Sequence, residues 1–150
     1  VQMSNIAQMV NVLQSVILTE GEKMILTPTY YVYDMYQAHQ DAQRVDAVLQ
    51  DVPKVQDMDS VTVSASVKDG KVLATLCNID LENSVTVDLK LRGKGCASAS
   101  ATTLTSDIMD QHNTFDEPER LAPSELAVEI LPDGCRLTLP PKSVTALVLE

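Results

Sequence analysis

The sequence has no tryptophan and one phenylalanine, and its four tyrosines all lie between residues 30 and 36. A core must therefore be built from Val, Leu, Ile and Ala, and the apolar fraction of 45% supplies enough of them. No apolar run approaches the roughly 20 residues that a membrane-spanning helix needs, so we expect a soluble chain with no membrane partner. At 150 residues the chain can hold one ordinary domain, or one domain with a piece of another attached.

Positive charge is also scarce. The chain has 11 Lys and Arg residues against 21 Asp and Glu residues, which gives a formal net charge of −10. Proteins bind nucleic acids and anionic membranes through Lys and Arg, so this balance disfavours both partners. It does not disfavour a neutral partner such as a sugar. Acidic surfaces also keep cytoplasmic proteins soluble, and a cytoplasmic location is the interpretation we adopt.

Cysteine is limited to Cys77, Cys96 and Cys135, which are odd in number and far apart. None forms a Cys-x-x-Cys pair, and no histidine lies at a metal-ligand spacing from any of them. We interpret all three as reduced, buried residues of a cytosolic protein, and we expect neither a metal nor a cofactor.

The first forty residues combine helical and strand patterns. Apolar side chains recur at i, i+3, i+4 and i+7 over residues 4–18, which predicts a helix with Ser4 as N-cap and Gly21 after its last turn. The run 24–26 predicts a short buried strand. Thr27-Pro28 predicts the N-cap and first residue of a second helix. Helix, strand, helix is the pattern of an α/β segment.

Residues 40–59 show no period and contain Pro53, which indicates a connector and the best domain boundary. After residue 60 the apolar period becomes two, with turn signals such as Asp69-Gly70 and Pro132-Asp133-Gly134. These patterns predict strands at 61–67, 72–79, 85–91, 96–105, 126–131, 135–139 and 143–149. Short strands joined by hairpin turns predict an antiparallel β-sandwich. One long loop, 106–124, interrupts it, and such loops are usually functional, interfacial or mobile.

Two pairs of nearby carboxylates were weighed as catalytic groups: Glu20 with Glu22, and Asp116 with Glu117. A retaining glycosidase needs two carboxyl groups about 5–5.5 Å apart, one of them with a raised pKa. Neighbouring carboxylates in turns are far more often solvated surface charge. We therefore assign no catalytic residue to this chain.

Other polar and aromatic candidates are few. His39 ends the second predicted helix, where the helix dipole favours an imidazole, and His112 lies in the long loop. No nucleophile elbow or phosphate-binding loop is present in the sequence. Helical tyrosines can stack on a sugar but more often pack at the edge of a core, which is the interpretation we favour for Tyr30, Tyr31, Tyr33 and Tyr36. Gln8 is a polar side chain in a packed segment and could aim its amide at a ligand.

Several long strings carry a family resemblance. Residues 5–11, followed by 18–20, resemble the last part of the catalytic barrel in the α-L-arabinofuranosidases of glycoside hydrolase family 51. Residues 27–36, with 39–42, resemble the segment that leaves that barrel. The strings 112–118 and 139–144 are similar to the C-terminal β-domain of the same enzymes. The resemblance covers essentially the whole chain.

The resemblance implies an enzyme that removes terminal α-L-arabinofuranosyl groups from arabinose-containing oligosaccharides with retention. The family uses a glutamate acid/base and a glutamate nucleophile on a (β/α)8 barrel, and both belong to strand ends upstream of this chain. We therefore expect a structural, non-catalytic C-terminal piece. One substrate contact carries over: the glutamine of the family's Ile-Ala-Gln-x-Val-Asn run, which matches Gln8.

The expected organisation is mainly β. Residues 1–42 would be the terminal helix-strand-helix segment of the catalytic barrel, 43–59 a connector, and 60–150 a jelly-roll-like antiparallel β-sandwich. Its partners would be the rest of the barrel and further copies of the enzyme in a homo-oligomer. A stand-alone carbohydrate-binding module and an assembly domain remain alternatives. Against the first, only Phe115 follows Tyr36 as an aromatic platform for a sugar ring.

Overall fold

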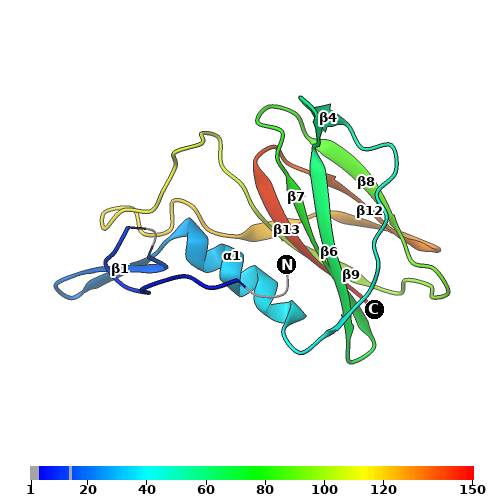
Figure 1. The fold of residues 1–150 in the computed structure, drawn as a ribbon, viewed down its shortest axis with the longest axis horizontal. Helices are drawn as coiled ribbons and strands as arrows, with labels where there is room; N and C mark the ends of the chain where they lie inside the picture. The colour runs from blue at the N-terminus through cyan, green and yellow to red at the C-terminus, as the bar shows by residue number, and fades with distance from the viewer. Residues whose placement is uncertain (1–3, 14) are drawn as a thin grey trace.

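The computed structural model describes residues 4–13 and 15–150. Two antiparallel β-sheets pack face to face, and helix α1 (Pro28–Tyr36) lies on the outer side of the larger sheet (Figure 1). The larger sheet has the strand order β10-β9-β13-β7-β6-β3 and the smaller one the order β11-β12-β8. The mainly β, antiparallel architecture expected from the sequence is confirmed.

The larger sheet consists of six strands: β3 (Gln43–Arg44), β6 (Val61–Lys68), β7 (Lys71–Asn78), β9 (Ala99–Leu104), β10 (Ser124–Leu126) and β13 (Ser143–Leu149). The smaller sheet consists of β8 (Val85–Lys90), β11 (Val128–Leu131) and β12 (Gly134–Leu139). Two short hairpins complete the strands: β1 (Ile17–Glu20) with β2 (Lys23–Leu26), and β4 (Lys54–Val55) with β5 (Met58–Asp59).

Strand β13 is covered on both faces. Leu147 and Leu149 point between the sheets, where they join Leu137 and Leu139 of β12 in the main core. The alternate residues of β13 point to the other side, toward α1. Because successive side chains of a strand alternate between faces, a strand buried on both sides is apolar nearly throughout, as β13 is.

The predicted strand 126–131 is two strands in different sheets, so that prediction is wrong in part. Residues 124–126 form β10 against β9, whereas residues 128–131 form β11 against β12. The chain passes from one sheet to the other at Ala127. Alternation could not reveal the transfer because Leu126 and Val128, on either side of it, both pack against the main core.

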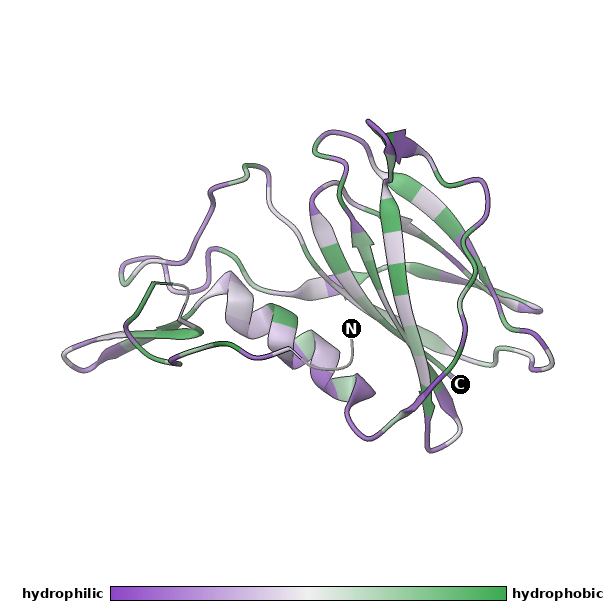
Figure 2. Ribbon diagram, viewed as in Figure 1, coloured by the Kyte–Doolittle hydropathy of each residue, from purple (hydrophilic) through white to green (hydrophobic). Residues whose placement is uncertain are grey.

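The predicted helix over residues 4–18 is also wrong, and the helix-strand-helix order with it. Residues 17–20 form β1, which pairs with β2 through a turn at Gly21, and residues 4–13 are not helical. Met9, Val10 and Leu13 remain 60%, 46% and 92% exposed. The exposed fractions of these side chains show that the apolar spacing is not set by burial within this chain. Figure 2 shows hydrophobic residues along this N-terminal segment.

Helix α1 begins as predicted, with Thr27 as N-cap and Pro28 in the first turn. Its Met35 is buried against Leu104 of β9 and Leu121 of the long loop, with Tyr31 and Val32 packed around them. A 3₁₀ turn, η1 (Gln37–His39), follows directly.

His39 fastens the end of this helical segment to the larger sheet. Its Nδ1 lies 2.7 Å from Ser66 Oγ on β6, and its Nε2 lies 2.8 Å from Thr75 Oγ1 on β7. Both ring nitrogens thus have a protein partner in the folded chain. Burial lowers the pKa of His39, because desolvation disfavours the imidazolium.

The stability of the chain should fall in mild acid because of His39. Its native pKa lies below its unfolded pKa of about 6.5, so the unfolded chain binds the proton more readily. The free energy of unfolding should decrease as pH falls through 6.5, and the H39Q variant should lose this part of the dependence. Urea unfolding between pH 5 and 8 measures it, with H112Q, at an exposed position, as control. An unchanged slope in H39Q would contradict the assignment.

Gly134, at the start of β12, allows the close approach of β8. A Cβ at this position would lie 1.8 Å from the carbonyl oxygen of Leu89, which is backbone and cannot move aside cheaply. G134A should therefore lower the free energy of unfolding by about 1–3 kcal/mol, the usual range for overpacking. The control is G95A, whose new Cβ would meet its nearest atom, Pro132 O, at 3.6 Å. Equal stability of the two variants by urea unfolding would contradict this account.

Candidate functional site

Gln8 lies on the N-terminal segment ahead of the β1–β2 hairpin, and its side chain is exposed. Its φ is 61°, in the left-handed region, and Asn11 three residues later has φ 54°. Asparagine tolerates this region comparatively well, whereas glutamine is found there less often. Conformations of this kind cluster at functional sites and persist only where the surrounding structure determines them.

Backbone hydrogen bonds to β1 hold the segment that follows Gln8. The Met9 carbonyl oxygen accepts hydrogen bonds from the amides of Val16 and Ile17, both at 3.1 Å. The backbone amide of Asn11 donates to the Ile17 carbonyl oxygen at 3.1 Å, and Val10 forms a parallel bridge with Ile17. The chain around Gln8 is thus fixed relative to the hairpin.

The hairpin in turn is tied to helix α1 through Thr27. The Thr27 hydroxyl donates to the Ser15 carbonyl oxygen at 2.8 Å, and the Thr27 amide donates to the Val16 carbonyl oxygen at 3.0 Å. The hydroxyl bonds to the hairpin segment and not to the first turn of the helix, which has no side-chain cap hydrogen bond.

Asn113 ties the long loop to the same junction. This side chain is 4% exposed, and its Nδ2 donates to the carbonyl oxygens of Leu26 and Leu121, both at 2.9 Å. Its Oδ1 accepts from the Leu121 amide at 2.7 Å. Sequence reasoning missed Asn113, although the length of loop 106–124 had marked it as functional, interfacial or mobile. The loop contacts β2 through Asn113 and α1 through Leu121.

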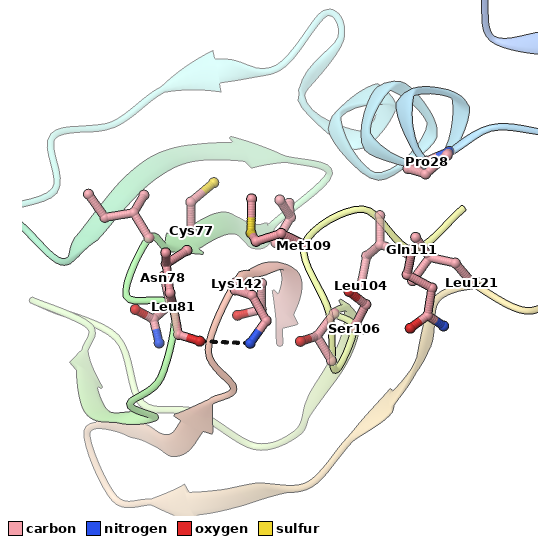
Figure 3. Close-up of a pocket in the computed structure, with 14 residues that line it drawn as sticks. Pro28, Cys77, Asn78, Leu81, Leu104, Ser106, Met109, Gln111, Leu121 and Lys142 are labelled. Carbon is pink, nitrogen blue, oxygen red and sulfur yellow. Dashed lines mark hydrogen bonds between the residues drawn. The ribbon is translucent and has the colours of Figure 1, made fainter. Parts of the chain in front are cut away.

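An open cleft of about 440 Å³ lies between this loop, the start of α1 and the adjacent ends of the sheet strands (Figure 3). Its lining is mostly apolar and includes Leu81, Leu104, Met109 and Leu121. Lys142 reaches across one side, where its Nζ donates to the Leu81 carbonyl oxygen at 2.7 Å. None of the lining residues is Asp or Glu, so the cleft does not offer the carboxyl pair of a glycosidase.

The carboxylates singled out from the sequence are surface charge. Glu20 and Glu22 flank the turn of the β1–β2 hairpin and are exposed. Glu117 pairs with Arg120 at 2.8 Å, and exposed Asp116 lies 3.9 Å from Lys23 Nζ. The structure does not bring either pair into a pocket.

No Asp or Glu side chain within residues 4–13 and 15–150 is buried. Where the carboxyl pKa is displaced, it is lowered. Backbone amides of residues 82 and 83 lower the pKa of Asp80, the Arg136 guanidinium lowers that of Asp88, and Lys71 lowers that of Glu150. A general acid needs the opposite shift.

Tyr31 and Tyr36 pack where α1 meets the sheet, whereas Tyr33 is exposed, so the packing interpretation is wrong for Tyr33. Burial, followed by the neighbouring Cys77 thiol, raises the pKa of Tyr36 to about 12, and the Tyr36 hydroxyl lies 3.8 Å from Cys77 Sγ. Burial also raises the pKa of Tyr31, whose ring meets that of Tyr30 edge-on at 5.7 Å. Tyr33 is more exposed, and its hydroxyl lies 3.0 Å from Ser4 Oγ.

Two further expectations concern cysteines and metals. All three cysteines are free, but only Cys135 is buried, so the prediction of burial is wrong for Cys77 and Cys96. In the part of the chain that the structure describes, no group of three His, Cys, Asp or Glu side chains is arranged to hold a metal ion. No helix in that part is both long and apolar enough to cross a membrane.

The sequence of this chain is similar to those of known proteins. Residues 1–143 match the model of the family described as the alpha-L-arabinofuranosidase C-terminal domain. The chain is similar to an intracellular exo-alpha-L-arabinofuranosidase of Bacteroides ovatus, with 36% identity over 156 residues that cover 99% of this chain and 30% of that protein.

Solved structures agree with this match. The arabinofuranosidase of glycoside hydrolase family 51 from Xanthomonas axonopodis pv. citri superposes with a TM-score of 0.91 and 37% identity, over 100% of this chain and 31% of that one. A family 51 α-L-arabinofuranosidase from Bifidobacterium longum gives a TM-score of 0.86 over 96% of this chain and 30% of that one, and at 23% identity it supports the fold alone.

The chain therefore spans about a third of the length of these relatives. Both the family model and the 36% identity extend over nearly all of its own length. The chain belongs to the family of C-terminal domains of the α-L-arabinofuranosidases of glycoside hydrolase family 51.

Proposed function

We propose that this chain is the C-terminal part of a longer, cytoplasmic α-L-arabinofuranosidase that releases terminal α-L-arabinofuranosyl groups with retention. The observation that carries the proposal is the extent of the match: 99% of this chain aligns with only 30% of a relative named as an intracellular exo-alpha-L-arabinofuranosidase. The catalytic glutamates would lie in the remaining part of the enzyme. The solvated carboxylates of this chain are consistent with that division.

The proposed organisation places residues 1–42 at the end of a catalytic (β/α)8 barrel, 43–59 as connector and 60–150 as the sandwich. Exposed apolar side chains in the N-terminal part support an interface between this part and a partner. Met9, Val10, Leu13 and Met24 are exposed, and we call these four residues the N-terminal apolar surface; Leu13 is 92% exposed. Exposed apolar surface of this kind marks an interface, and the rest of the barrel is the partner we propose.

Gln8 is the residue of this chain that we propose to contact the arabinofuranosyl group. Its amide offers a carbonyl acceptor and two N–H donors, which suit sugar hydroxyls that both donate and accept. Three observations support this role: its exposed side chain, its left-handed backbone and its place in the run 5–11 that resembles the family. A homo-oligomeric state of the complete enzyme remains a prediction.

The catalytic proposal is tested with the complete gene product and the 150-residue chain side by side. The complete enzyme should hydrolyse a nitrophenyl α-L-arabinofuranoside, and NMR of the first-formed sugar should show the retained anomer. The 150-residue chain should show no turnover, because none of the Asp and Glu side chains in the described part of the chain is buried, as a general acid with a raised pKa would be. Turnover by the short chain would overturn its non-catalytic role. Saturable heat on titrating it with arabino-oligosaccharides would instead favour a carbohydrate-binding module.

The interface proposal predicts how the isolated 150-residue chain behaves in solution. Its N-terminal apolar surface should drive self-association, because the partner that would cover it is missing. L13D should reduce the mass measured by light scattering, while I130D, at an exposed position on β11, should leave it unchanged. In the complete enzyme L13D should lower the melting temperature. A monomeric wild-type chain would contradict the proposal.

A further inference from the structure

We propose that Asn11 is a positioning residue that fixes the backbone at Gln8 through a two-point clamp on Thr19. The inference rests on the sugar contact proposed above for Gln8 and assigns the part of the chain that holds this contact in place. It concerns a pair of residues eight positions apart, on the N-terminal segment and on β1.

The clamp uses both ends of the Asn11 amide. Its Nδ2 donates to Thr19 Oγ1 at 2.8 Å, and its Oδ1 accepts from the Thr19 backbone amide at 2.7 Å. A side chain bonded at one point can still rotate about that bond, whereas two bonds to the same residue fix its direction. The clamp therefore defines the orientation of the backbone at residue 11 relative to β1.

The clamp adds to the backbone hydrogen bonds of the segment. Among the described residues, Met9 and Asn11 bond through their backbone to Val16 and Ile17, at the start of β1. Thr19 lies two residues further along the strand. By bonding there, Asn11 extends the length over which the segment is attached to β1.

Asparagine suits position 11 for two reasons: the backbone there is left-handed, and the clamp needs a side chain that both donates and accepts. Asn is among the few non-glycine residues that accept a left-handed backbone, and φ at Asn11 is 54°. The same side chain supplies the donor and acceptor of the clamp. Gln8, three residues earlier at φ 61°, has no comparable local bond among the side-chain contacts of the described residues, so its conformation depends on its neighbours.

Both members of the clamp are exposed. Hydrogen bonds that compete with water contribute modestly to folding, so removing this one should change stability little. A purely structural role would then leave almost no trace. A positioning role predicts a kinetic effect that depends on Gln8, and a double-mutant cycle can isolate that dependence.

The test measures kcat/KM of the complete enzyme for four proteins: wild type, Q8A, N11G and the double variant. Glycine keeps the left-handed backbone available, so N11G removes the clamp without adding strain. We expect N11G to lower kcat/KM roughly fivefold, the scale of one or two hydrogen bonds. In the Q8A background the same change should have less than a twofold effect.

Matched variants separate the clamp from other consequences. Asp at position 11 can accept from both the Thr19 amide and the Thr19 hydroxyl, so N11D should restore most of the activity. T19V removes the hydroxyl while keeping the shape and should show an intermediate loss, whereas T19S should resemble wild type. Hydrogen exchange at the Thr19 amide gives a readout independent of activity, and it should quicken in N11G.

The outcomes distinguish failure of the two proposals. If Q8A leaves kcat/KM unchanged, the sugar contact fails and this inference fails with it. If Q8A impairs the enzyme but N11G has no effect, or has an equal effect in both backgrounds, Asn11 does not act through Gln8 and only this inference is overturned. Unchanged exchange at Thr19 in N11G would show that the clamp does not hold the strand.

Discussion

The position of α1 on the larger sheet depends on the burial of Met35 against Leu104 and Leu121, together with the hydrogen bonds of His39 to β6 and β7. Burial of a side chain of this size contributes roughly 1.5–3 kcal/mol, and it occurs on the outer face of a sheet whose inner face is already packed. The helix has no side-chain cap hydrogen bond and spans nine residues, so isolated helix formation cannot hold it in place. Tertiary contact does so instead. Once α1 is docked, Thr27 fixes the position of the hairpin, and the hairpin fixes the segment that carries Gln8.

The sandwich could be predicted because strands such as β6, β8 and β12 face two environments, which leaves a period of two in the sequence. Asp69-Gly70 shows how strongly local chemistry acts: both residues have positive φ, and β6 and β7 pair directly across this two-residue turn. The alternation of apolar residues does not show which sheet a strand joins. Residues on either side of Ala127 both pack against the main core but belong to different sheets. The run 4–18 failed for a related reason, since its apolar residues are spaced as on a helix while Met9 and Leu13 contact solvent in this chain.

In the candidate site, one residue could be found from the sequence and another only from the structure. Gln8 was found through a resemblance of short strings, which preserve residue identity without geometry. Asn113 lies 87 residues from Leu26, to which its amide donates, and no local pattern can predict a contact at that separation. Its burial became visible only once the long loop was placed beside β2. A buried amide with all its bonds made to backbone groups rigidifies the junction, because removing it would leave several buried polar groups without partners.

A domain without a catalytic carboxylate can still influence catalysis when a rigid path joins its core to a binding residue. Here the path is short and each step is a specific contact. The larger sheet holds Met35, α1 presents Thr27, Thr27 bonds to the carbonyl oxygens of residues 15 and 16, and the Val16 amide bonds to Met9 next to Gln8. Through these contacts the sandwich would support the sugar contact that we propose for Gln8.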